Sequence, residues 1–243
     1  MLSSALNLEN FKPSSENVAI KSFSASFGFS GRLDAEFYQS KYDDLKIFLE
    51  TLKTYELGDL VNIFKSIEPG SDCYGMEGTP FIRVSDVNKF GIAEPEIKIA
   101  GNYAENLYPR KDTILFSKDG SIGIAYNVRE DMKAITSGAL LHLTIKNKSI
   151  VIPDYLTLVL NSKIVQMQAE RDSNGAIIKH WKPDDIKKVV VPVVSREMQE
   201  KIAAQVAESF RLRSESEKLL YKAKAAVEIA IEQGEDAAIK FLR

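Results

Sequence analysis

The sequence is poor in the side chains that most often bind metals or form disulfides. Cys73 is the only cysteine in 243 residues, and His142 and His180 are the only histidines. A single cysteine cannot form an intrachain disulfide, and one cysteine with two distant histidines does not make a zinc site. The composition therefore predicts no structural metal, and it fits a reducing compartment.

Long hydrophobic runs are also missing. A membrane-spanning helix needs roughly 18 nearly uninterrupted apolar residues, and no segment of the chain approaches this. Residues 1–9 contain no basic region followed by an apolar core, which a secretory signal would have. We expect a cytoplasmic protein with no membrane partner.

Motifs for nucleotide and methyl-donor binding are absent as well. The chain has no Gly-x-x-x-x-Gly-Lys-Ser/Thr loop, and no Gly-x-Gly-x-x-Gly motif follows a strand-like segment. Asp154, together with Asp185 and Lys187, superficially resembles the acids and lysine of a metal-dependent nuclease. Asp154 is better suited to the first turn of a helix, and Asp185 to a Lys-Pro-Asp-Asp turn. We therefore expect no catalytic, cofactor-binding or metal-binding residues.

The charge of the chain shows no basic excess. It has 32 Lys and Arg residues against 34 Asp and Glu, which gives a formal net charge of -2. Nucleic-acid-binding proteins more often carry a basic excess. Binding to DNA would therefore require basic side chains gathered on one face, or a partner that supplies phosphate contacts.

Short apolar runs separated by turn residues fill the middle of the chain and predict strands. The expected strands are residues 79–84, 113–117, 122–126, 139–145 and 189–193, with a weaker one at 18–23. Helical spacing of apolar residues predicts helices at 43–53 and 153–169. The pattern predicts an α+β fold, with a largely antiparallel β domain and packed helices. The expected divisions are an N-terminal segment with a short helix (1–54), the β domain (55–194), a long helix (195–233) and a C-terminal tail (234–243).

The long helix is predicted because no glycine or proline interrupts the chain between Ser195 and Gly234. A helix of about 38 residues would be about 57 Å long, and apolar residues follow one of its faces in steps of three and four. This pattern favours a coiled coil, while an ordinary surface helix is the alternative. The residues expected at a dimer interface are Ile202, Val206, Leu212, Leu219, Ala223 and Val227.

Three polar segments, at residues 83–88, 118–123 and 171–182, have the composition of a DNA-binding surface. Arg can pair with guanine and Asn with adenine, while Lys and backbone N–H groups bind phosphates. Each segment would also suit an ordinary turn or loop, and Trp181 would suit a core position. The candidate DNA-binding residues are Arg83, Ser85, Asn88, Lys118, Ser121, Arg171, Ser173, Asn174, Lys179 and His180.

Taken in order along the chain, a series of segments resembles the target-recognition module of type I restriction-modification specificity subunits. The matching segments are Leu57–Leu60, Pro80–Val87, Asp112–Gly123, Thr136–Leu140, Pro153–Leu156, Ile186–Pro192 and Arg196–Ile202, preceded by Gly31–Tyr38. The resemblance implies an α+β recognition domain followed by a helix that acts as a molecular ruler. Ordered matches over most of the chain are far more specific than any single loop.

The resemblance also implies partners. The chain would select a double-stranded DNA sequence, and a DNA adenine methyltransferase subunit would modify adenine with S-adenosylmethionine. A separate restriction or translocating subunit would cut. On this reading the chain is a non-catalytic specificity subunit and holds no cofactor itself.

The sequence departs from the resembled family in one respect. Family members carry two recognition domains and two helices, whereas this sequence has one of each. We expect two chains to form an antiparallel homodimer through residues 195–233 and to read an inverted repeat. The alternative is a non-DNA coiled-coil adaptor, whose β domain binds protein and whose helix sets the spacing.

Overall fold

The computed structural model describes residues 1–16, 18–175 and 177–242. The chain forms two compact units, Met1–Ile202 and Ala203–Arg243. The fold is α+β with mainly antiparallel sheets in the first unit, as predicted, and a long helix towards the C-terminus.

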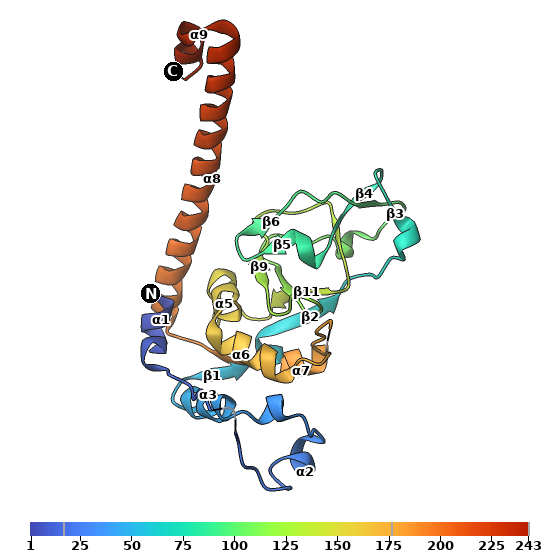
Figure 1. Cartoon of the computed structure of the whole chain (residues 1–243), viewed down its shortest axis with the longest axis vertical. Coiled ribbons are helices and arrows are strands. Elements are labelled where there is room, and N and C mark those ends of the chain that lie inside the picture. Colours follow the sequence, from blue (N-terminus) through green and yellow to red (C-terminus); the bar gives the residue numbers. More distant parts are fainter. Residues whose placement is uncertain (17, 176, 243) are drawn as a thin grey trace. The chain divides into compact units, whose positions relative to one another are not determined.

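The centre of the first unit is a four-stranded antiparallel sheet in the order β2-β11-β8-β9 (Figure 1). Its strands are β2 (Val61–Lys65), β11 (Leu140–Ile145), β8 (Ile114–Ser117) and β9 (Ala125–Asn127). Leu143 of β11 lies opposite Ile63 on one side and Ile114 on the other. Every residue of β8 is buried, so this strand runs through the core with both faces covered.

A second four-stranded sheet has the order β10-β4-β7-β3. Its strands are β10 (Ile135–Thr136), β4 (Thr79–Ile82), β7 (Lys98–Ile99) and β3 (Tyr74–Gly75). The β10–β4 pair is parallel and the other pairs are antiparallel. Phe81, Ile99 and Ile135 form its buried core. Two antiparallel pairs complete the strands: β5 (Val87–Asn88) with β6 (Gly91–Ile92), and β1 (Thr54–Glu56) with β12 (Val190–Pro192).

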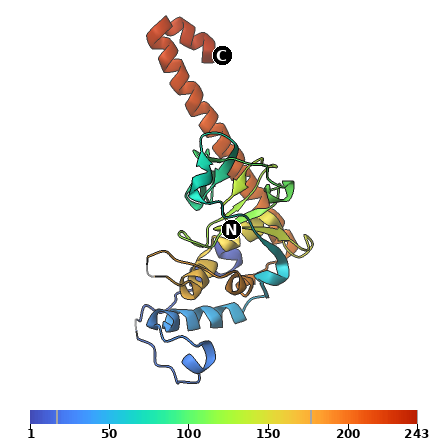
Figure 2. The same cartoon turned by 90° about the vertical axis from the view of Figure 1, so that its right-hand side faces the viewer.

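The main helices of the first unit are α3 (Ser40–Glu50), α5 (Pro153–Leu160), α6 (Lys163–Asp172) and α7 (Pro183–Lys187). Figures 1 and 2 show α3 beside α6. Leu45 and Leu49 of α3 form a buried cluster with Ile164 and Met167 of α6. The N-terminal segment is therefore part of the core of the first unit rather than an appendage.

The remaining elements of the first unit are short. They are α1 (Leu2–Ala5), η1 (Leu8–Asn10), α2 (Phe27–Ser30), η2 (Ala35–Tyr38), α4 (Leu57–Leu60), η3 (Ser71–Cys73), η4 (Val84–Asp86) and η5 (Glu105–Leu107).

Three expectations about local structure are corrected. Residues 18–23 form no strand. The helix predicted over 153–169 divides at Asn161, whose side-chain amide donates to the carbonyl oxygens of Thr157 (2.9 Å) and Ala125 (2.8 Å). A polar side chain that bonds to the backbone in this way competes with helix continuation. The expected turn at residues 182–185 instead starts α7, because Pro183 suits the first turn of a helix.

The second unit consists of most of α8 (Arg196–Gln233) and of α9 (Glu235–Leu242). The predicted long helix is thus confirmed. Within the C-terminal segment expected at 234–243, residues Glu235–Leu242 form the helix α9. Gly234 has a φ of +95°, which lets the chain reverse direction there. Ala226 and Ala238 are buried where α9 folds back along the end of α8.

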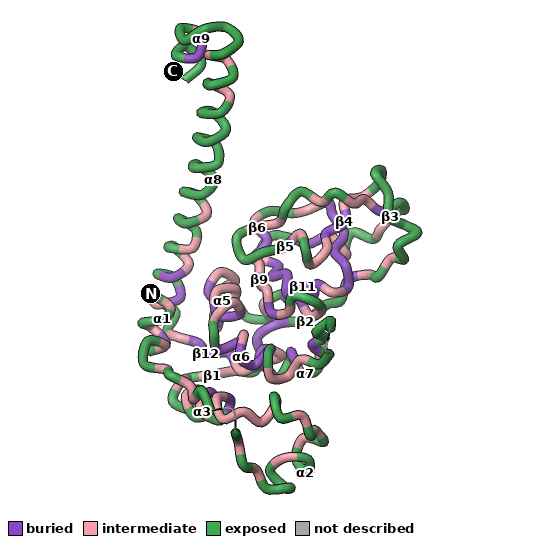
Figure 3. Tube along the Cα trace, in the orientation of Figure 1, coloured by how far each residue is buried: buried purple, intermediate pink, exposed green. Residues whose placement is uncertain are grey.

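Burial differs sharply along the chain, as Figure 3 shows. Purple segments include much of β9 and β11 in the first unit, whereas β3 and α8 from Ala203 onward are mainly exposed. Among the helices in the described part of the chain, none is both long and apolar enough to cross a membrane.

Candidate nucleic-acid interface

The turn after β8 presents the first candidate segment, residues 118–123. The buried Ser117 organises it, because its hydroxyl donates to the Ser121 carbonyl oxygen (2.5 Å) and accepts from the Ile124 N–H (2.8 Å). Gly123 has a φ of +78°, and a Cβ at this position would lie 2.8 Å from the Gln166 side-chain nitrogen. The Ser117 hydroxyl, together with Gln166 of α6, which packs against Gly123, therefore stabilises this turn.

The structure brings residues 118–120 beside residues 179–181. The Gly120 N–H donates to the Lys179 carbonyl oxygen (2.9 Å), and the Trp181 N–H donates to the Lys118 carbonyl oxygen (2.8 Å). Trp181 is only 1% exposed and lies against Phe116 of β8, with ring centroids 5.7 Å apart. Trp181 is thus a core residue that attaches the second segment to the central sheet.

The Asp119 carboxylate of the first segment contacts a side chain of the second segment. Asp119 forms an ion pair with Lys118, and its Oδ1 lies 2.9 Å from Nδ1 of His180. The Lys118 and Asp119 side chains are 13% and 20% exposed, whereas that of His180 is 61% exposed. Asp119 therefore orients the exposed imidazole and balances the charge of Lys118.

Two further lysines, close in sequence to His180, have no acidic partner among the described residues. Lys179 and Lys182 are exposed, and neither has a carboxylate within 4.0 Å among the residues that the structure describes. Asn174 is also exposed, and its backbone forms a reciprocal pair of hydrogen bonds with His180 (2.9 and 2.7 Å). We name this set, Lys118, Asn174, Lys179, His180 and Lys182, the lysine surface.

Arg171 and Ser173 precede the lysine surface and have local partners. The Arg171 guanidinium lies 4.5 Å from the centroid of Phe37, and Arg32 lies 4.4 Å from the same centroid. Arg171 also contacts the Asp172 carboxylate at 3.4 Å. Burial raises the pKa of Asp172. The Ser173 hydroxyl donates to the Glu170 carbonyl oxygen at 3.4 Å. Arg171 would therefore lose existing contacts if it turned towards a ligand.

The segment at 83–88 is likewise bonded within itself. The Arg83 guanidinium lies 3.3 Å from the Asp86 carboxylate, which also accepts from the Arg83 backbone N–H (2.8 Å). The Ser85 hydroxyl donates to Asp86 (3.0 Å), and the Asn88 side chain accepts from the Phe90 N–H (2.8 Å). These polar groups stabilise the turn η4 and the β5–β6 hairpin, so a base would have to compete with Asp86 for Arg83.

The carboxylates considered for a nuclease have structural surroundings. Asp154 lies in the first turn of α5, and its Oδ1 accepts from Asn127 (2.8 Å) and Arg129 (2.6 Å). Asp185 lies within α7. No group of three or more His, Cys, Asp and Glu side chains suitable for a metal occurs in residues 1–16, 18–175 and 177–242. His142 is buried in β11, and this burial lowers its pKa to about 4.

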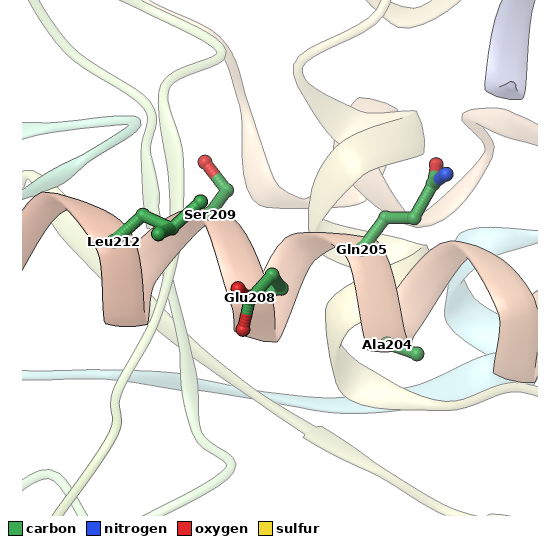
Figure 4. Close-up of a pocket in the computed structure, with 5 residues that line it drawn as sticks. All are labelled: Ala204, Gln205, Glu208, Ser209 and Leu212. Atoms are coloured by element: carbon green, nitrogen blue, oxygen red, sulfur yellow. The ribbon is translucent and has the colours of Figure 1, made fainter.

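The residues expected at a dimer interface fall into two groups. Ile202 is 1% exposed and belongs to the first unit, so it is already covered within the chain. Leu212, Leu219 and Val227 are 51%, 60% and 58% exposed, Ala223 is exposed and Val206 is half-buried. Figure 4 shows Leu212 at one end of an open depression that also includes Ala204, Gln205, Glu208 and Ser209. The exposed apolar face of α8 therefore starts near Val206.

Sequence reasoning missed two features of this region. It did not assign a role to Asp119, although the adjacent Lys118 was a signal for a local ion pair. It also missed the stacking of Arg32 and Arg171 on Phe37, because Arg171 is far from Phe37 in the sequence and neither segment has a regular pattern.

Comparison with known proteins gives a family and a fold. A sequence model of the type I restriction modification DNA specificity domain matches residues 50–220. The type I restriction enzyme EcoBI specificity subunit of Escherichia coli is 27% identical over 213 residues, which are 82% of this chain and 44% of that protein. The crystal structure of the type I restriction-modification system S subunit from M. genitalium has a TM-score of 0.56 at 16% identity, over 74% of this chain and 45% of that one.

The chain thus spans less than half the length of each of these two relatives. The family match nevertheless extends from the end of α3 through the whole β domain and into α8. On the strength of this match, the chain belongs to the family of type I restriction modification DNA specificity domains.

Proposed function

We propose that this chain recognises one half-site of a double-stranded DNA sequence and has no catalytic activity of its own. The observation that carries the proposal is the pairing of residues 118–120 with residues 179–181, which brings the side chains of the lysine surface together. Two lysines without acidic partners supply phosphate contacts there, and an exposed amide and imidazole supply groups that can read base edges. Membership of a DNA specificity family supports the same assignment.

The lysine surface also accounts for binding without a net positive charge. The chain carries a formal charge of -2, and some of its charges elsewhere are balanced in local ion pairs, such as Arg129 with Asp154 and Arg196 with Glu200. An unpaired lysine attracts a phosphate more strongly than one whose charge a carboxylate already balances. Arg83, Ser85, Asn88, Ser121, Arg171 and Ser173 remain proposed contacts, and those bonded locally would have to exchange a partner within the chain for DNA.

We also propose partners for the chain. A DNA adenine methyltransferase subunit, which carries S-adenosylmethionine, would modify the recognised site, and a restriction subunit could join the complex. A second copy of the chain would pack along the exposed apolar face of α8 at Val206, Leu212, Leu219, Ala223 and Val227. A two-fold pair of readers would recognise an inverted repeat. On this proposal, residues 55–194 are the recognition domain and residues 195–233 the spacer.

The test starts with selection of bound duplexes from a random-sequence pool, followed by titration of the selected duplex at several salt concentrations. We expect salt-dependent binding that prefers the selected sequence, because phosphate contacts release counterions. Lys179→Ala should weaken binding to all sequences and lower the salt slope by about one. Asn174→Ala should relax the preference at one base pair at a cost of about 1–3 kcal/mol.

The matched control is Lys12→Ala, which removes an exposed lysine outside the three polar segments and should leave both properties unchanged. If no sequence is enriched, even with a cognate methyltransferase present, the DNA-reading proposal is wrong and the adaptor alternative gains support.

A further inference from the structure

The loop beyond the lysine surface ends in two exposed isoleucines. Ile177 is 97% exposed and Ile178 is 56% exposed. Isolated exposed apolar residues are common, but two adjacent β-branched side chains at a loop tip leave a substantial apolar area in water. The domain does not need them for its core, since Trp181 and Ile186 anchor this region.

The base of this loop is held on both sides. His180 forms backbone hydrogen bonds with Asn174 across the loop, and the residues on either side of it, Lys179 and Trp181, bond to the 118–120 segment. Gly175 has a φ of +109°, and a Cβ there would lie 2.0 Å from the Ile178 carbonyl oxygen. Only glycine therefore lets the two arms approach this closely, and the isoleucines are presented from a fixed base.

The charges around the tip identify its partner. Lys179 follows Ile178 directly, Lys182 lies near the base, and neither has an acidic partner among the described residues. The nearby Asp119 carboxylate is already paired with Lys118 and His180. An apolar tip followed closely by unpaired cations is complementary to a ligand that presents both apolar surface and negative charge, such as stacked bases and the adjacent phosphates of DNA.

We propose that Ile177 and Ile178 form a wedge that enters the DNA duplex at a base-pair step, while Lys179 and Lys182 hold the adjacent phosphates. Proteins that insert Ile, Leu, Met or Phe in this way unstack one step and bend the duplex. The wedge favours steps that unstack easily, such as pyrimidine–purine steps, and so adds sequence preference without a hydrogen bond to a base. This inference rests on the proposed function and adds a second means by which the protein distinguishes DNA sequences.

The experiment uses the selected duplex with 2-aminopurine, a base whose fluorescence rises on unstacking, placed at each position in turn. A donor and acceptor dye at the two ends report bending. Wild-type protein is expected to raise the fluorescence at one step and to shorten the end-to-end distance. The Ile177→Ala, Ile178→Ala double variant should lose both signals and bind roughly tenfold more weakly.

Two further variants separate wedge insertion from general damage. Ile177→Met, Ile178→Met keeps long apolar side chains and should retain the fluorescence signal. Ile20→Ala removes a residue of the same type that is 96% exposed elsewhere in the first unit, and it should behave as wild type.

Sequence-specific binding by the wild type with no unstacked position and no bend overturns the wedge but leaves the proposed function in place. Unstacking that persists in the double alanine variant overturns it equally. Absence of any sequence-specific binding overturns the proposed function together with the wedge.

Discussion

The two units of the chain differ in where they place their apolar side chains. Met1–Ile202 has an extensive buried core, in which Phe81, Phe116 and Trp181 are at most 1% exposed, although some large apolar side chains such as Phe64 and Ile177 are exposed. In Ala203–Arg243 the side chains of Leu212 and Leu219 are more than half exposed. A unit that buries its own apolar surface can be stable alone, whereas an exposed apolar face along a helix is typical of a surface that another chain covers.

The lysine surface belongs to the first unit, Met1–Ile202. Its two segments are joined to each other by backbone hydrogen bonds and to the central sheet by Trp181. A binding surface with this support loses little conformational entropy when it meets DNA. On the proposed function, the two units would have different tasks: the first would recognise DNA, and α8 would mediate assembly.

The largest expected effect comes from a cavity in the first unit. Phe116→Ala removes a fully buried ring that contacts Trp181. It should lower the free energy of unfolding by about 3–5 kcal/mol. Urea unfolding followed by the fluorescence of Trp181, the only tryptophan, measures this unit specifically.

Leu219→Ala on α8 is the matched control, since it also deletes a large apolar side chain but from an exposed position. It should leave the Trp181 transition nearly unchanged. Equal losses in the two variants would contradict the distinction between the units.

The next effect concerns association through α8. Leu212→Glu, Leu219→Glu places four charges in the proposed dimer interface and should weaken self-association by at least about a hundredfold. Sedimentation equilibrium should find the wild type as a dimer and this variant as a monomer.

Ser214→Glu, Tyr221→Glu provides the control for association. It adds the same number of acids with the same spacing of seven residues, on the opposite side of the helix. It should remain dimeric. A wild type that stays monomeric at tens of micromolar, alone and with its methyltransferase, would remove the second copy from the proposal.

A smaller effect on the first unit follows from His142. Burial lowers its pKa to about 4 from an ordinary value of 6.5, and its Nε2 lies 2.8 Å from the Thr136 hydroxyl. The unfolded chain binds a proton below pH 6.5, whereas the folded chain does so only near pH 4. Stability from the neutral ring is therefore complete above pH 6.5 and is lost as the pH falls towards 4, by up to about 1.4 kcal/mol per unit.

His142→Gln keeps a polar group that can bond to Thr136 but does not titrate. Unfolding measured between pH 4 and pH 7 should thus depend less on pH in this variant than in the wild type. Parallel pH profiles would show that the folded chain accommodates a charged imidazole.

The sequence predicted the parts of the fold that repeat a simple pattern. The long helix follows from an uninterrupted run of helix-forming residues, and β8 and β11 follow from compact apolar runs between turns. It could not predict the break at Asn161, because this depends on a carbonyl oxygen of Ala125 in a distant strand. Nor could it predict α9, because a segment of eight residues makes only about two helical turns, too short for the spacing of its apolar residues to distinguish a helix from a tail.

The candidate site was predictable only as separate loops. Local composition indicated Lys118 and Lys179, but their proximity depends on the backbone pairing of residues 118–120 with 179–181. The same tertiary contacts explain why Arg83 and Arg171 differ from the lysines. Their guanidinium groups contact Asp86 in one case, and Asp172 and Phe37 in the other. The sequence identifies a polar side chain, but only the fold shows whether that side chain already contacts another group of the chain.

The smallest expected effect compares ion pairs in the two units. Arg211 on α8 contacts Glu208 (2.7 Å) and Glu215 (2.9 Å), and all three side chains are more than half exposed. In the first unit, Arg129 contacts Asp154 (2.6 Å), and these side chains are only 30% and 17% exposed. Salt screens exposed charges much more strongly than partly buried ones.

Arg211→Gln should therefore cause a slight loss of helix content by circular dichroism at low salt, and this loss should vanish near 1 M salt. Arg129→Gln should lower the midpoint of the Trp181 unfolding transition at both salt concentrations, because it leaves Asp154 partly buried with one partner fewer. The control for the helix is Lys222→Gln, at an exposed position without an acidic partner among the described residues. If salt abolished the effect of Arg129→Gln as well, the Asp154 site would be as open to solvent as α8, and the difference between the two units would not extend to their charges.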